Sequence, residues 1–207
     1  QWSTAAGLLE KLAEYDPEKA EAYRQQRAAY QSNQEDKEAL AQARRRRTEA
    51  EYAEALRALK SIGGDSPYAA QARNLEAMVE AEQRLQRAQT LYHAGQGEEA
   101  LKVLKGDGGT DALALKGRIE RVLQAREKAL AAKKKGDLEA EREAWLGVTD
   151  AETNQRNFYR QEALRELDRF RGRLKTLAED HFARGKALYQ ESKFTDARQQ
   201  FQKALRL

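Results

Sequence analysis

The chain has 207 residues, of which 35% are charged, and its 38 basic and 34 acidic residues leave a net charge of only +4. This near balance favours solubility over the binding of polyanions. The absence of cysteine excludes disulfides and thiolate metal sites. It fits a reducing cytoplasm and is also tolerated in a bacterial periplasm. No apolar run approaches the roughly 20 residues that a membrane-spanning helix needs.

The apolar residues are those of helices. The chain has 37 alanines and 24 leucines, whereas isoleucine and valine together number only 6. Alanine and leucine favour helix, and β-branched residues are the usual material of strands. With 46 bulky apolar residues in all, a thick core is hard to build. The composition therefore predicts an all-α protein, arranged as an elongated array of helices rather than a globule.

Capping residues and glycines divide the chain into nine predicted helices. Asp16 and Pro17 form one start signal, and "SNQED" at 32–36 forms another. Gly63 and Gly64, followed by Ser66 and Pro67, form the strongest stop and restart. The predicted helices lie near 4–15, 17–31, 35–62, 67–95, 97–105, 111–135, 138–149, 154–191 and 194–206.

Three of the turns between these helices share a pattern. We align them on Gly95, Gly136 and Ser192. Five positions later the residue is small in two copies (Ala100, Ala197), whereas Glu141 replaces it in the middle copy. Nine positions later the residue is bulky in all three: Leu104, Trp145 and Phe201. An earlier half-copy holds Tyr52, Ala55, Leu59 and Ile62 at the same spacing. A small residue lets a neighbouring helix approach, and the large residue four later fills the gap beside it. The pattern therefore predicts antiparallel helix pairs.

The last of these copies resembles the tetratricopeptide repeat, a helix–turn–helix unit of 34 residues. The matching residues are Gly185, Leu188, Phe194, Ala197, Phe201 and Ala204, and an earlier copy matches at Ala88, Leu91, Gly95, Ala100 and Leu104. The aligned turns are 41 and 56 residues apart, so the repeats are irregular. The resemblance implies antiparallel helix pairs stacked in an irregular superhelix, an α–α solenoid. We expect residues 1–62 to form an atypical N-terminal helical part and residues 67–207 to form the repeats.

No Ser-His-Asp or Cys-His arrangement is evident, so we expect no enzyme activity, metal or cofactor. We expect a protein–protein interaction scaffold or adaptor that forms part of a larger bacterial protein, either cytoplasmic or in the periplasmic part of an envelope protein. In the family, the first helix of each repeat lines a concave groove. The matching positions are Gln89, Tyr92, His93, Arg126, Lys133, Lys134, Phe182, Lys186, Tyr189 and Gln190. They combine aromatic surface with positive charge, which suits an acidic partner segment with apolar anchors. The alternative is that Tyr92 and Tyr189 only cover the next helix pair.

One structural alternative is a spacer or oligomerising coil without a groove. Residues at coiled-coil spacing run along the helix predicted at 154–191: Ala163, Leu167, Phe170, Leu174, Leu177, His181, Arg184 and Leu188. His181 and Arg184 interrupt the stripe at one end. We therefore expect a monomer that packs this stripe within the chain, with a coiled-coil dimer as the alternative.

Other motifs do not predict a site. The arginines at 44–47 would point in four directions on a helix and have acids around them, so we expect a solvated surface rather than nucleic-acid binding. His93 and His181 lack a third ligand at metal spacing. The "KGDGGT" segment at 105–110 lacks the Lys-Ser/Thr ending of a phosphate loop.

Overall fold

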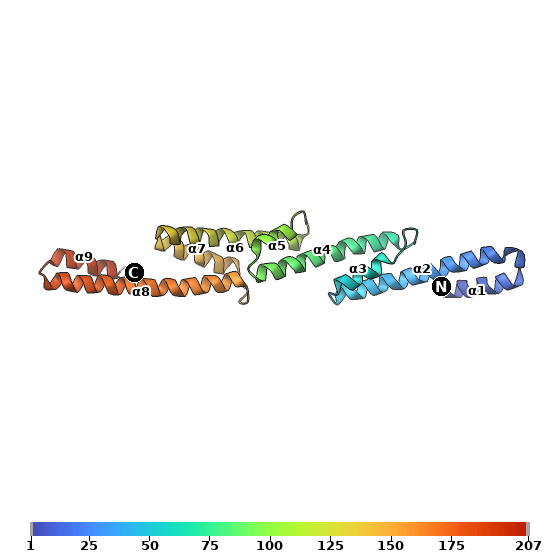
Figure 1. The fold of residues 1–207 in the computed structure, drawn as a ribbon, viewed down its shortest axis with the longest axis horizontal. Helices are drawn as coiled ribbons and strands as arrows, with labels where there is room; N and C mark the ends of the chain where they lie inside the picture. Colours follow the sequence, from blue (N-terminus) through green and yellow to red (C-terminus); the bar gives the residue numbers. More distant parts are fainter. Residues whose placement is uncertain (1, 206–207) are drawn as a thin grey trace. The chain divides into compact units, whose positions relative to one another are not determined.

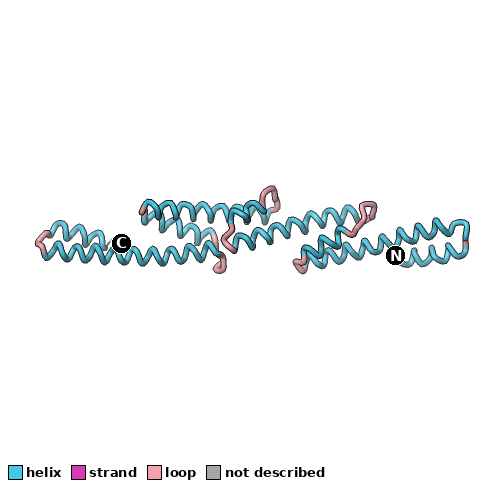
Figure 2. Tube along the Cα trace, in the orientation of Figure 1, coloured by secondary structure: helices cyan, strands magenta, loops and turns pink. Residues whose placement is uncertain are grey.

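The computed structural model of the chain describes residues 2–205, and every regular element within this range is a helix (Figures 1 and 2). The all-α class predicted from the composition is confirmed, and successive helices pack in pairs. The contacts group the helices into two units, Gln1–Gln86 and Arg87–Leu207. This division falls inside a helix. The division expected between residues 62 and 67 separates an atypical helical part from the repeat-like part of the sequence. It stays a prediction.

The first unit begins with α1 (Trp2–Tyr15), which packs against α2 (Ala20–Thr48) across the short 3-10 helix η1 (Pro17–Lys19). After α2 the chain turns back into α3 (Tyr52–Lys60) and then enters α4 (Ala69–His93). Pro17 begins a helix as predicted, because its fixed φ suits a first helical position.

Two predicted boundaries in this unit are wrong. No helix starts at "SNQED", because α2 runs without a break through residues 32–36. The helix predicted at 35–62 is instead broken at residues 49–51, where Ala50 adopts a left-handed conformation (φ 59°). Polar residues that are able to cap a helix are also tolerated inside one, so the capping signal alone did not locate the turn.

The core of the first unit joins α2, α3 and α4. It contains the buried residues Leu40 and Ala43 of α2, Ala55 and Leu59 of α3, and Ala72, Leu75 and Val79 of α4. The alanines allow close approach between helices, and the larger residues fill the space beside them. Burial of each large aliphatic side chain contributes roughly 1.5–3 kcal/mol. Thus α4 covers the α2–α3 hairpin on one side.

The second unit contains the end of α4 and all later helices. These are α5 (Gly97–Val103), α6 (Thr110–Lys135), α7 (Leu138–Ala151), α8 (Phe158–Gln190) and α9 (Phe194–Leu205). Side chains cap the starts of α7 and α8. Asp137 accepts a hydrogen bond from the Ala140 N–H at 3.1 Å, and Asn157 accepts one from the Tyr159 N–H at 2.8 Å. Such caps satisfy N–H groups that a helix leaves unpaired at its start.

Four turns among residues 2–205 have the same backbone geometry. Ala50, Gly95, Gly136 and Ser192 each have a positive φ and each end a helix. The next residue donates its N–H to the carbonyl five residues back, over 2.9 Å in the turns at Ala50, Gly95 and Ser192 and 3.1 Å at Gly136. This is the bond of the Schellman motif. We call these four the turn residues, and the two helices that each one joins a hairpin.

Small residues recur at fixed distances from the turn residues. Seven positions before each turn residue lies a buried small residue: Ala43, Ala88, Ala129 and Gly185. Five positions after it lie Ala55, Ala100, Glu141 and Ala197, which are also buried. The hairpin pattern inferred from three turns thus extends to a fourth at Ala50, which the sequence had shown only as a half-copy.

The one large residue among these positions is Glu141, and α8 neutralises it. The Arg173 Nη2 atom lies 2.5 Å from the Glu141 Oε1 atom, and the Arg173 guanidinium also lies over the Phe170 ring at 5.4 Å. A buried carboxylate requires such a partner, because an unpaired charge in the interior is very costly. The α6–α7 hairpin therefore depends on α8 for its electrostatic balance.

Candidate interaction surface

The structure brings together four of the ten residues expected in the groove and places the others differently. Phe182, Lys186, Tyr189 and Gln190 are all exposed on the last turns of α8. Their spacing of four, three and one residues puts them on one side of a helix. The other six lie on α4 and α6, where the exposed ones are Gln89, His93, Lys133 and Lys134.

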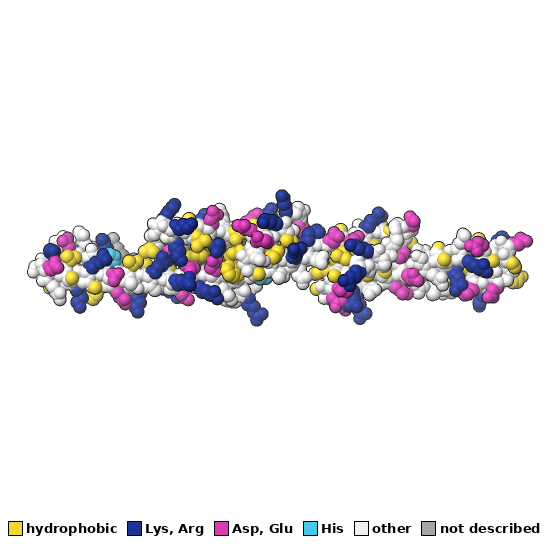
Figure 3. Space-filling model, in the orientation of Figure 1, with side chains coloured by type: hydrophobic (Ala, Val, Ile, Leu, Met, Phe, Trp, Pro, Cys, Tyr) yellow, Lys and Arg dark blue, Asp and Glu magenta, His cyan; other side chains and the backbone are white. Residues whose placement is uncertain are grey.

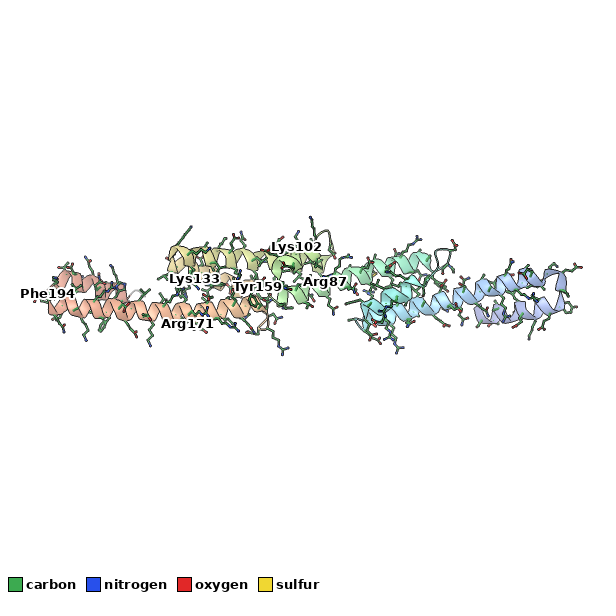
Figure 4. The ribbon with its side chains drawn as sticks, viewed as in Figure 1. Arg87, Lys102, Lys133, Tyr159, Arg171 and Phe194 are labelled. Carbon is green, nitrogen blue, oxygen red and sulfur yellow. The ribbon has the colours of Figure 1, made fainter. Side chains whose placement is uncertain are left out.

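Tyr92 is buried in the structure and cannot contact a partner. Its ring stacks on that of Tyr159 with the centroids 5.5 Å apart. The Tyr159 hydroxyl donates to the Gly95 carbonyl at 2.7 Å and accepts from the Gly97 N–H at 2.8 Å, which fixes the start of α8 against the α4–α5 turn (Figure 4). Burial, and next the carboxylate of Glu152, raise the pKa of the Tyr92 phenol, which therefore stays neutral.

Next to Tyr92, His93 takes part in the same junction. Its Nδ1 atom lies 3.2 Å from the Asn157 Nδ2 atom, at the residue that caps α8. Because the amide nitrogen of Asn157 is a donor, the histidine Nδ1 acts as the acceptor. The role of His93 in the structure is thus to position the end of α4 and the start of α8.

Two of the basic residues expected in the groove, Arg126 and Lys133 of α6, pair with α8. Arg126 makes a two-pronged contact with Glu162, at 2.6 and 2.8 Å. Lys133 lies 2.5 Å from Glu166, and this ammonium, with Arg169, holds the pKa of the Glu166 carboxyl below its usual range. Paired charges of this kind orient two helices. These two cations therefore help to dock α8, and the positive charge expected of them in a groove is neutralised.

At the C-terminal hairpin, α8 and α9 form an apolar groove of about 500 Å³ lined by Ala178, Glu179, Phe182, Phe201, Ala204 and Leu205. The Phe182 and Phe201 ring centroids are 5.5 Å apart, and Phe182 is 54% exposed. Nearer the turn, the exposed rings of Tyr189 and Phe194 meet edge to face at 5.3 Å. We call the groove and this aromatic pair, together with the exposed Lys186 one helical turn after Phe182, the open face.

The open face corresponds to a covered surface in the other hairpins. The residue nine positions after the turn residue is 3% exposed at Leu59, 1% at Leu104 and 0% at Trp145. At the α8–α9 hairpin the same position is Phe201, which is only half-buried. Sequence reasoning had placed Phe201 at a contact between helices. It did not show that this aromatic would also border an exposed groove.

The coiled-coil stripe of α8 is used largely within the chain. Ala163 and Phe170 are buried, and His181 Nδ1 lies 2.8 Å from Gln200 Oε1 on α9. Leu177 and Arg184 are exposed. Within the chain, α8 packs on α7 and on α9. The monomer, with the coiled-coil dimer as its alternative, stays a prediction.

The arginines at 44–47 each have a neighbouring partner. Arg44 donates to Gln71, Arg45 and Arg46 pair with Glu49, and Arg47 pairs with Glu82. On the face seen in Figure 3, basic and acidic side chains are interspersed. Among residues 2–205 no group of three potential metal ligands occurs, and no helix there is long and apolar enough to cross a membrane.

Comparisons with known proteins give no relative from which to assign a family. No protein-family profile matches the chain, and neither a curated protein nor a solved structure shows significant similarity to it.

Proposed function

We propose that the chain is a protein–protein interaction scaffold, built of irregular tetratricopeptide-like hairpins, and that it holds a partner on the open face of the α8–α9 hairpin. One observation carries this proposal. The position occupied by Leu59, Leu104 and Trp145 is fully covered in three hairpins, whereas Phe201 borders an exposed apolar groove in the fourth. Clustered exposed aromatics are typical of interaction sites, since their burial supplies much of the binding energy.

The repeat-like character of the hairpins supports the same proposal. Ala43 and Ala55, Ala88 and Ala100, and Gly185 and Ala197 are each twelve residues apart and buried on either side of an equivalent turn. The stacking of such hairpins into a superhelix is part of the proposal. Arrays of this kind bind partners on surfaces formed by successive units.

Affinity capture with the full chain as bait tests the function. Phe182→Asp places a charge in the middle of the open face, and Leu113→Asp places one at a similarly exposed leucine on α6. We expect a partner that is captured by the wild type and by the Leu113 variant but lost with the Phe182 variant. Equal capture by all three baits would contradict the site.

A second pair of changes tests the basic edge. Lys186→Glu combined with Tyr189→Ala alters two exposed residues and should leave the melting temperature within a few degrees, as surface substitutions usually do. We expect this variant to lose the same partner. A helical spacer without a ligand surface is the alternative function, and it predicts that no captured protein depends on these residues.

A further inference from the structure

The hairpins of this chain show what kind of surface fits over them. In the first unit, the helix that covers the α2–α3 hairpin is α4, which contributes Ala72, Leu75 and Val79 to the shared core. These residues follow the pattern small, then large at the third and seventh positions later. All three lie on one side of α4, as helical spacing requires.

The same pattern recurs in the two later long helices. In α6, which packs on α5, the buried residues include Ala112, Leu115 and Ile119 at this spacing. In α8, which packs on α7, they include Ala163, Glu166 and Phe170. The small residue comes first each time, and an aliphatic or aromatic residue lies seven positions later. Only the middle residue changes character, and Glu166 does so where Lys133 pairs with it.

A polar contact at the edge of the α2–α3 hairpin accompanies this apolar pattern. Arg44, six positions before its turn residue, donates to Gln71 at 3.1 Å, and Gln71 directly precedes Ala72 on α4. The corresponding residue of the α8–α9 hairpin, six positions before Ser192, is Lys186. A cation at this position favours an acidic or amide side chain on a helix that lies over the hairpin.

We propose that the open face binds an amphipathic α-helix of a partner protein, with an acid or amide, then a small residue, then large apolar residues three and seven positions after the small one. This proposal rests on the proposed function and specifies its partner. The helix occupies the groove beside Phe182 and Phe201 as α4 occupies the surface beside Leu40 and Leu59. Its acid faces Lys186. Grooves that take the apolar side of a helix are a common recognition mode.

The chain itself supplies the probe. A labelled peptide of residues 66–86 with Gln71→Glu, here called the acidic peptide, carries the full pattern, and its binding to the full-length chain is measured by fluorescence anisotropy. We expect Phe182→Asp in the protein to weaken binding roughly tenfold or more, as loss of a central aromatic contact does. Leu113→Asp in the protein should leave binding unchanged. Leu75→Asp with Val79→Asp in the peptide should abolish it.

Charge exchange tests the predicted register. Lys186→Glu should weaken binding of the acidic peptide by about two- to fivefold, the effect of an exposed ion pair. A peptide with Gln71→Lys should bind this variant better than it binds the wild type. The same preference in both proteins would overturn the placement of the acid opposite Lys186.

The outcomes test the proposed helical partner and the proposed function separately. If affinity capture finds a partner that depends on Phe182 but the peptide does not bind, the proposed function stands and the helical partner is overturned. If the peptide binds the Phe182→Asp variant as tightly as the wild type, the open face is not its site and the proposal fails. Sedimentation velocity tests whether a second copy of this chain occupies the open face instead. Self-association that disappears with Phe182→Asp would identify that copy as the occupant and overturn the proposal.

Discussion

The α2–α3 and α8–α9 hairpins have the same internal construction and different surroundings. Ala43 and Ala55 in one, and Gly185 and Ala197 in the other, are buried at equivalent positions on either side of a left-handed turn residue. The first hairpin lies under α4, so its large side chains are buried. The second leaves Phe182 and Phe201 at an apolar groove. The contact within a hairpin is therefore encoded by small residues, whereas the environment of its large residues depends on what packs over it.

The largest expected difference concerns the large residue nine positions after each turn residue. Leu59→Ala should destabilise by about 2–5 kcal/mol, because it leaves a cavity between three helices. Phe201→Ala should cost less, about 1–2 kcal/mol, since its half-buried ring loses less burial on truncation. Urea unfolding gives the totals, and hydrogen exchange shows which hairpin opens. Equal losses at both positions would mean that Phe201 is covered as well as Leu59 is.

Larger side chains in place of the small residues test the contact between the two helices of each hairpin. Ala197→Leu inserts bulk between α8 and α9 and should cost roughly 1–3 kcal/mol. Ala55→Leu should cost more than Ala197→Leu, because Ala55 lies in a buried cluster to which three helices contribute. Ala183→Leu, at an exposed position of α8, is the control and should change the denaturation midpoint little. Equal midpoints for the Ala183 and Ala197 variants would refute the hairpin alignment.

Acid should selectively weaken the α6–α8 contact. Lys133 first, and Arg169 next, lower the pKa of Glu166 below its unfolded value of about 4.3. The resulting stability is present above the unfolded pKa and is lost as the pH falls through the folded pKa. Glu166→Gln should remove this dependence at a cost on the order of 1 kcal/mol at neutral pH. Parallel pH–stability curves for the wild type and the variant below pH 5 would contradict the pairing.

Much of the helix content was predictable, because alanine, leucine and capping residues act locally. The turn at Ala50 was missed because alanine rarely adopts a left-handed conformation. The twelve-residue spacing of Ala43 and Ala55, the same as that of Gly185 and Ala197, was the signal that could have located it.

The candidate surface was predictable only in part. Phe182, Lys186, Tyr189 and Gln190 follow from the repeat pattern on a single helix, so a local argument was enough to group them. The burial of Tyr92 depends on Tyr159, 67 residues later in the chain, and no local pattern connects the two. Contacts between distant helices, here between α4 and α8, decide which positions of a repeat stay exposed.

The smallest expected effect should be alike in the two hairpins, because it concerns their turns alone. Ala50 and Ser192 hold positive φ values of 59° and 61°, which strain any residue with a Cβ atom. Ala50→Gly and Ser192→Gly should each stabilise by about 0.5–1 kcal/mol, the gain expected when glycine replaces a strained residue, reduced by the greater freedom of glycine in the unfolded chain. Gly136→Ala, at φ 71°, is the reverse control and should destabilise by a similar amount. Thermal melts of the three variants measure these changes. A clearly larger gain at Ser192 would mean that contacts beyond the backbone also stabilise the turn at Ala50. The two hairpins would then differ in their turns as well as in their surroundings.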